Sequence, residues 1–275
     1  MTTADVTVVD AGTSPDKANA LVGAVLADAT QVEVPDIEEA PDTVVNLPAG
    51  YLTPDGELLT VAEVRELTGE DEEALAKAAS SRNLLKVTNV ILQRGVVNIG
   101  GVPADAKLLN NLLVGDREAL VAGVRKATYG KVVDLDVVCP ACQNKMSVGV
   151  DLDADVPIKK LDDANQRTFR LDLRNGYCEV SLPTGNTQDY VSNSQAKTPA
   201  EINTVLLGQV VESINGEPVV GLGPVRRLGM KDRKTILDFI TEKQPGPQYE
   251  DVKQECDACS REIPLPLDLG DLFRG

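Results

Sequence analysis

Four cysteines occur as two CxxC pairs, and their type and spacing point to metal binding. The pairs are Cys139/Cys142 and Cys256/Cys259, with 113 residues between them. Two intervening residues let the backbone turn so that both sulfurs face one ion, and structural zinc takes four such ligands. The chain contains no histidine, so each pair needs the other to complete the set. We predict one structural zinc ion bound by all four cysteines, with no ligand position left for a substrate.

Three other uses of the cysteine pairs stay open at the level of sequence. A redox CxxC lies at a helix N-terminus after a strand, whereas strands are expected on both sides of each pair here. Disulfides would need an oxidising compartment, and four cysteines can also hold an iron–sulfur cluster. The fifth cysteine, Cys178, follows an expected hairpin turn and is predicted to be a small packed residue.

No other group of residues indicates catalysis. The absence of histidine excludes Ser-His-Asp and Cys-His arrangements. The segment GLGPVRRLG has glycines, but they lack the spacing of a phosphate-binding or dinucleotide-binding loop. Carboxylates are numerous, and no pair stands out as a general acid and base. We therefore expect a protein that is not an enzyme and has no small-molecule substrate.

The charge of the 275-residue chain bears on its partners. The net charge is −16, from 43 acidic and 27 basic residues, which opposes binding to nucleic acid because that binding depends on clustered lysine and arginine. No apolar run approaches the roughly 20 residues of a membrane span, and the N-terminus lacks the pattern of a secretory signal. We expect neither nucleic acid nor membrane as partner, synthesis in the cytoplasm, and an acidic surface that serves solubility or docking.

A series of motifs occurs twice from residue 44 onward. Each copy has an LPxG opening (VVNLPAG or EVSLPTG) and an apolar run expected to be helical (88–103 or 203–218). A helix with a capping aspartate follows, Asp116 or Asp232, and then a strand, a knuckle and a second strand. The offset between copies rises only from 115 to 117 residues along this order, as small insertions in homologous copies would produce. We predict an α+β fold of two pseudo-repeats joined by a shared zinc-ribbon-like site.

Three domains follow from this organisation. Residues 1–43 are predicted to be an N-terminal arm, with a strand, a helix and an acidic linker. Residues 44–157 form the first repeat with its CPAC knuckle, and residues 158–275 form a hairpin and the second repeat with its CDAC knuckle. The polar stretch 184–197 replaces the helix expected at 67–82 of the first copy, and we expect it to be an exposed loop.

The motifs resemble those of the baseplate hub assembly chaperone and baseplate hub protein family of T-even-type contractile-tail phages. The resemblance rests on the Asp-Arg pair that opens each helix, the Cys-Pro-x-Cys knuckle, the Glu-Asp-Glu helix start at 70–72, and the PLDLG-Phe tail at 266–273. It covers residues 44–275. The second knuckle lacks the usual proline, and Gln143 and Ser260 stand where the family commonly has glycine.

The resemblance implies a structural or assembly protein of the tail baseplate, in the hub or wedge region. Its partners would be other tail and baseplate proteins, and its location the virion, after synthesis in the host cytoplasm. The alternative is a zinc-ribbon accessory protein associated with nucleic acid, which the net charge and the lack of interleaved aromatic and basic residues disfavour.

Overall fold

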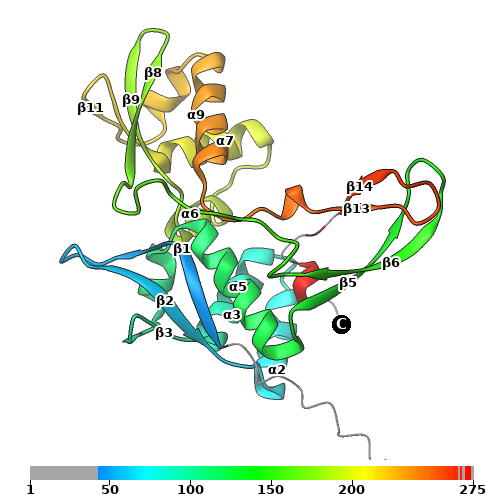
Figure 1. Ribbon diagram of the computed structural model, residues 1–275. Coiled ribbons are helices and arrows are strands. Elements are labelled where there is room, and N and C mark those ends of the chain that lie inside the picture. Colours follow the sequence, from blue (N-terminus) through cyan, green and yellow to red (C-terminus); the bar gives the residue numbers. More distant parts are fainter. Residues whose placement is uncertain (1–42, 266, 268–269, 274–275) are drawn as a thin grey trace, which may run out of the picture. The chain divides into compact units, whose positions relative to one another are not determined.

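The computed structural model describes residues 43–265, 267 and 270–273, which belong to one compact unit, and they form a mixed α+β fold as predicted (Figure 1). The arm predicted for residues 1–43 lies outside the described residues, apart from residue 43.

The first half contains a four-stranded antiparallel sheet in the order β1-β2-β3-β4. Its strands are β1 (Val44–Leu52), β2 (Leu58–Val64), β3 (Val96–Ile99) and β4 (Val102–Pro103). Its helices are α2 (Gly69–Ala79) and α3 (Leu84–Gly95) between β2 and β3, and α4 (Ala106–Asn111) and α5 (Val114–Tyr129) after β4.

The second half has a sheet of the same form, in the order β11-β10-β9-β8. Its strands are β8 (Thr168–Leu173), β9 (Gly176–Ser181), β10 (Val211–Ile214) and β11 (Glu217–Pro218). Its helices are α6 (Gly185–Ser192) and α7 (Pro199–Val210) between β9 and β10, and α8 (Gly223–Arg227) and α9 (Met230–Lys243) after β11. The element order ββααββαα therefore occurs twice.

The two sheets also share details of turn and pairing. Asn98 of β3 faces Glu63 of β2 and donates to its carboxylate, and Ser213 of β10 does the same with Glu179 of β9. Both β3–β4 and β10–β11 turn through two residues of positive φ, as tight hairpins require. By these contacts β2 corresponds to β9, and β3 corresponds to β10.

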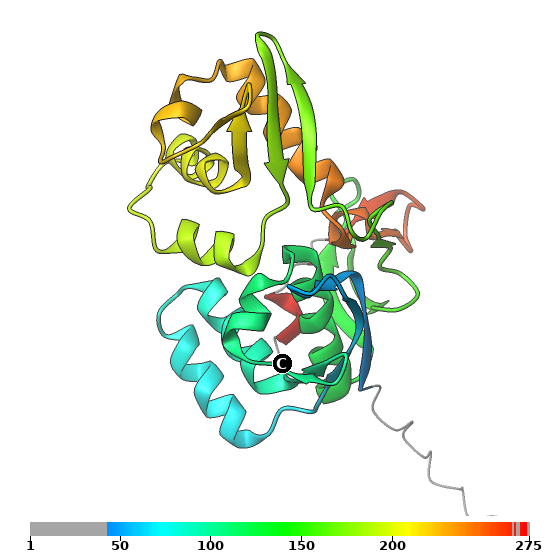
Figure 2. The same ribbon diagram turned by 90° about the vertical axis from the view of Figure 1, so that its left-hand side faces the viewer.

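Each half continues into a hairpin that carries one knuckle. The hairpins are β5 (Val132–Val138) with β6 (Lys145–Asp151), and β13 (Lys253–Glu255) with β14 (Glu262–Pro264). They lie side by side in both views (Figures 1 and 2). The remaining elements are the paired strands β7 (Ile158–Lys159) and β12 (Gly246–Pro247), and the 3-10 helices η1 (Tyr249–Asp251) and η2 (Asp271–Phe273).

Two main hydrophobic cores hold the described residues together. One lies among β8–β10 and α7–α9. The other is larger and lies among β1–β3, α3–α5 and the β5–β6 hairpin, but it also contains Val252, Ile263 and Leu272 from the end of the chain. Leu272 is completely buried there. The last segment of the sequence thus completes the core of the first half, and the predicted three-domain division stays a prediction.

Several expectations about individual elements were wrong. The apolar runs 88–103 and 203–218 are helical only in their first part, because α3 and α7 pass directly into strands β3 and β10. The polar stretch 184–197 is not simply a loop, since it contains α6, which Thr184 begins with a capping box to Thr187.

The aspartates and the LPxG openings also have other roles than expected. Asp116 and Asp232 lie inside the first turn of α5 and α9, whose N-caps are Leu113 and Gly229. VVNLPAG lies in the edge strand β1, whereas EVSLPTG leaves the inner strand β9 for α6. The two openings therefore do not occupy equivalent positions.

Candidate metal centre

The structure brings the four predicted ligands, Cys139, Cys142, Cys256 and Cys259, into one cluster whose sulfurs all lie within 4.8 Å of one another. Sγ of Cys139 is 3.8 Å from that of Cys259, and Sγ of Cys142 is 3.6 Å from that of Cys256. Four sulfurs at ~2.3 Å from a tetrahedral zinc ion lie about 3.8 Å apart, whereas a disulfide needs ~2.05 Å. The cluster therefore has the spacing of thiolates around one metal ion.

The two knuckles have the same backbone geometry. In the first, the Gln143 N–H donates to the Cys139 carbonyl at 2.9 Å, and in the second the Ser260 N–H donates to the Cys256 carbonyl at 2.8 Å. Gln143 and Ser260 have φ values of 61° and 52°, in the left-handed region that favours glycine. This explains why glycine suits the position, and it shows that this chain accepts the strained conformation in both knuckles.

The protein backbone favours the thiolate form at the first cysteine. The Cys142 N–H, together with that of Ala141, hydrogen-bonds to Cys139 and lowers the pKa of its thiol to about 6, against the opposing effect of burial. A metal binds thiolate rather than thiol. Although the Asn144 N–H lowers it, burial and the neighbouring thiols raise the pKa of Cys142, so in the first knuckle the thiolate form is favoured at Cys139 alone.

The cluster lies at the boundary between core and solvent. Cys139 and Cys256 are buried in the larger core, while Cys142 and Cys259 are exposed. Cys178 is buried in the other core, away from the cluster, as a packed residue. An ion bound by the four cysteines would fix β13–β14 to β5–β6 and so tie together segments distant in the sequence.

The arginine of each Asp-Arg pair organises its half of the molecule, a role that the motif alone did not reveal. Nη1 of Arg117 donates to the carbonyl of Leu109 at 2.9 Å, and its Nη2 donates to Asn89 of α3. Arg233 bonds the carbonyl of Val225 at 3.0 Å and Thr204 of α7 at 2.8 Å. Each arginine thus ties three helices of its half.

The aspartate of each pair bonds backbone from the first hairpin of its sheet. Oδ1 of Asp116 accepts from the N–H groups of Ala49 and Gly50, at 2.8 and 3.3 Å. A bulge in β1 between Asn46 and Tyr51 takes these amides out of the ladder. Asp232 likewise accepts from the Arg174 N–H, just after β8. Only the matching position of the two aspartates was visible in the sequence.

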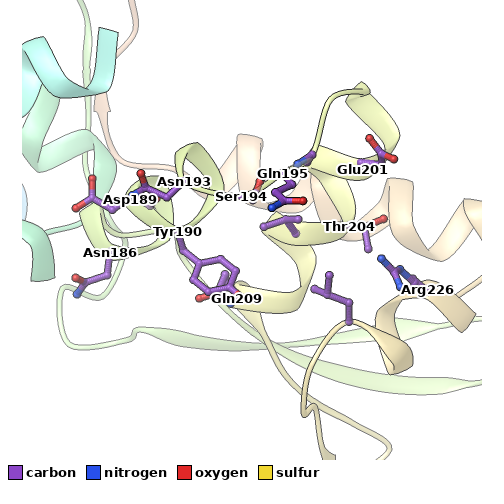
Figure 3. Close-up of a pocket in the computed structure, with 13 residues that line it drawn as sticks. Asn186, Asp189, Tyr190, Asn193, Ser194, Gln195, Glu201, Thr204, Gln209 and Arg226 are labelled. Atoms are coloured by element: carbon purple, nitrogen blue, oxygen red, sulfur yellow. Dashed lines mark hydrogen bonds between the residues drawn. The ribbon is translucent and has the colours of Figure 1, made fainter. Parts of the chain in front are cut away.

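A pocket of about 880 Å³ opens among α6, α7 and α8 (Figure 3). Its two carboxylates serve structure. Asp189 accepts from the side-chain amides of Asn89 and Asn110, and Glu201 accepts from the N–H groups of Lys197 and Thr198 at the start of α7. These backbone bonds, led by that from Lys197, lower the pKa of Glu201. Both carboxylates are therefore engaged in hydrogen bonds that hold neighbouring segments of the fold.

No helix among the described residues is both long and apolar enough to span a membrane. The sequence model of one protein family, described as T4 bacteriophage base plate protein, matches residues 43–214. This segment is more than half of the chain and includes the first knuckle. Searches among curated proteins and among solved structures gave no match.

Proposed function

This chain belongs to the T4 bacteriophage base plate protein family, and we propose that it is a structural subunit of the hub region of the baseplate. As a baseplate protein it is located in the tail of the phage particle and contacts other tail proteins. We further propose that it acts without catalysis, by holding neighbouring subunits at fixed positions.

The cysteine cluster is the observation that carries the scaffold role. It joins the hairpin after the first half to the hairpin after the second, with 113 residues of chain between the inner cysteines. A tie of this kind restricts how the two halves can move, because closing a long loop removes conformational freedom. A subunit that holds its neighbours at fixed positions needs this rigidity.

Zinc is the metal that we propose for the cluster, at one ion per chain. Four cysteine sulfurs at tetrahedral spacing are the usual ligands of a structural zinc ion. Such a site is closed, so the ion stabilises the fold and activates no water. The chemistry of the donors thus supports a structural role for the ion.

We also propose that the two halves are copies of one ancestral unit. The support is their shared element order, the matching contacts between β2 and β3 and between β9 and β10, and the matching bonds of the two arginines. On this proposal β1 corresponds to β8, because each supplies or adjoins the backbone that the aspartate of its half binds. Each copy then contributes half of the metal site.

The surfaces that contact neighbouring subunits are, in our proposal, the arm of residues 1–43 and the acidic exterior. A net charge of −16 favours docking onto basic surfaces and disfavours nucleic acid.

Quantitative mass spectrometry of purified phage particles and of tail assembly intermediates tests the structural role. We expect peptides of this chain in mature particles, at a fixed ratio to other baseplate proteins. Its presence in intermediates and absence from mature particles would instead identify a transient assembly chaperone.

Metal analysis of the purified full chain should give one zinc per protein, and iron in its place would contradict the zinc assignment.

A further inference from the structure

Helix α6 of the second half lies on a surface of the first half that is formed by α3, α4 and α5. Polar side chains hold it there. The bonds run from Asn110 to Asp189 at 2.9 Å, from Asn186 to Asn111 at 2.7 Å, and from Arg117 to Gln188 at 3.1 Å. The first half therefore has a docking site for one helix, and this site is occupied within the chain.

The second half has a surface that corresponds to this docking site. In both halves Nη1 of the arginine of the Asp-Arg pair bonds the backbone carbonyl eight residues earlier, that of Leu109 or of Val225. The residues that follow these two carbonyls therefore occupy corresponding positions. They are Asn110 and Asn111 in the first half, and Arg226 and Arg227 in the second.

The surface of the second half is open and basic. Arg226 and Arg227 are exposed, and the side chain of neither makes a hydrogen bond or ion pair among the described residues. Glu201 lies near Arg226, but its carboxylate already accepts the bonds at the start of α7. Arg226 also lines the pocket among α6, α7 and α8 (Figure 3). Met230, at the start of α9, is 89% exposed, so apolar surface is uncovered here as well.

The counterpart of α6 in the first half is α2. Each helix follows a Thr-Gly pair, at Thr68 or Thr184, and each threonine forms a capping box with the residue three positions later. This alignment has an offset of 116 residues. The three residues of α6 that hold it on the first half therefore have exposed glutamates as counterparts in α2. They are Glu70 for Asn186, Glu72 for Gln188, and Glu73 for Asp189.

The charges of α2 and of the open surface are complementary at all three contacts. Each polar pair of the occupied site has an arginine and a glutamate as its counterpart. The pairs are Arg226 with Glu73, Arg227 with Glu70, and Arg233 with Glu72. Guanidinium and carboxylate form short, charge-assisted hydrogen bonds, so the open surface suits α2 in chemistry as well as in position.

The α2 helix of the same chain cannot reach this surface. Asp71 is buried and pairs with Arg65 and Arg94, which fixes α2 to its own half. In both views α2 lies at the end of the first half that points away from α7 and α9 (Figures 1 and 2). The helix that fills the surface must therefore come from another molecule.

We propose that α2 of one copy of this chain docks on the α7–α9 surface of a second copy, as α6 docks on the first half within one chain. The contact joins two different surfaces, so it is head-to-tail and can continue into a ring or a row. Complementary charges steer separate molecules together, which explains arginine and glutamate in place of amides. The inference rests on the proposed equivalence of the two halves and specifies one contact of the proposed scaffold.

Sedimentation velocity of the full chain tests the contact. We expect association at protein concentrations up to about 0.1 mM in about 0.1 M salt. The complexes should dissociate in about 1 M salt, because the screening length falls from about 10 Å to about 3 Å.

Two charge reversals and one control locate the contact. Arg226→Glu with Arg227→Glu makes the open surface acidic, and Glu70→Arg with Glu73→Arg makes α2 basic. Each double variant alone should associate at least about a hundredfold more weakly, because like charges then face each other. An equal mixture of the two should associate again, which also shows that both variants fold. The control, Lys107→Glu with Lys160→Glu, changes the net charge equally at exposed residues elsewhere and should associate like the unmodified protein.

Three results would each overturn the proposal. They are a monomeric chain in about 0.1 M salt, undiminished association of either reversed variant, and a mixture of the two that stays monomeric. The measurements use the isolated protein and do not depend on its presence in phage particles. A monomeric chain that is nevertheless found in mature particles would refute the head-to-tail contact and leave the baseplate role standing.

Discussion

Arg117 of α5 and Arg233 of α9 make matching hydrogen bonds, yet Arg117 is only 1% exposed and Arg233 remains half-buried. The difference comes from α6, which belongs to the second half and packs against α3, α4 and α5 of the first. Gln188 of α6 accepts from Nε of Arg117 at 3.1 Å. The arginine of the motif is therefore more deeply buried in the first half than in the second, because α6 of the second half covers Arg117.

Removing one cysteine from either knuckle is the largest perturbation, and here the two halves should behave alike. If the cluster binds zinc as proposed, Cys139→Ser and Cys256→Ser should each lose the ion and destabilise the fold by about 5 kcal/mol, roughly the effect of opening a loop of a hundred residues. Metal analysis and chemical denaturation measure both quantities. Cys178→Ala is the matched control and should keep the metal. Retention of the ion by only one of the two variants would show that the two knuckles do not contribute equally to metal binding.

Truncating the two arginines should reveal the asymmetry directly. Arg117→Ala leaves Asn89 and the Leu109 carbonyl without their buried donor and should cost about 4 kcal/mol. Arg233→Ala, at the half-buried site, should cost about 1 kcal/mol. Denaturant unfolding of both variants measures these costs, and equal losses would contradict the shielding by α6.

A third pair of variants probes the start of α5, where a Cβ on Gly115 would lie 1.6 Å from the carbonyl oxygen of Pro245. Gly115 corresponds to Lys231 of α9 at the offset of the Asp-Arg pairs. Gly115→Ala forces a methyl group against Pro245 and should cost about 3 kcal/mol. Lys231→Ala changes an exposed residue and should cost about 0.5 kcal/mol or less. Thermal unfolding compares the two, and a neutral Gly115→Ala would show that the segment at Pro245 can move aside.

The pH dependence of stability tests the burial of Asp116. Desolvation raises its pKa from 3.8 to about 6, although the N–H groups of Ala49 and Gly50 oppose this. The folded state therefore binds the proton more tightly than the unfolded state does, so stability falls as pH rises from about 4 to 6. The decline due to Asp116 should reach about 3 kcal/mol.

Asp116→Asn keeps Oδ1 as an acceptor but cannot titrate, so its unfolding free energy should decline less over this range. Glu118, whose pKa burial raises to about 7, should account for part of the decline that remains. Urea unfolding at pH 4, 5, 6 and 7 measures the difference. An unchanged slope in Asp116→Asn would show that the carboxylate is already ionised at pH 4 in the folded protein.

Local patterns in the sequence were enough to predict part of this structure. Each CxxC knuckle, the helix α2, the alternating strand β5 and the β8–β9 hairpin depend on neighbouring residues of the chain. The knuckles were paired correctly because two ligands each, without histidine, left no other way to complete a site.

Long-range contacts explain what the sequence concealed. Asp116 looked like an N-cap because its type and position suit one, but its partners are amides of a bulge about 66 residues away. The two LPxG openings have the same sequence pattern, but one lies on an edge strand and the other follows an inner strand. Glu118, Pro183 and Tyr249 line one pocket but come from separate segments, so no local pattern could join them.

Because Leu272 is buried among residues of the first half, the two cores of this protein should complete their packing in a fixed order during synthesis. A ribosome releases the first sheet and its helices long before the segment that fills their core, so that core stays incomplete through most of synthesis. The second core, built from residues 168–243, has all of its parts earlier. The half that is translated first should therefore be the last to reach its final packing.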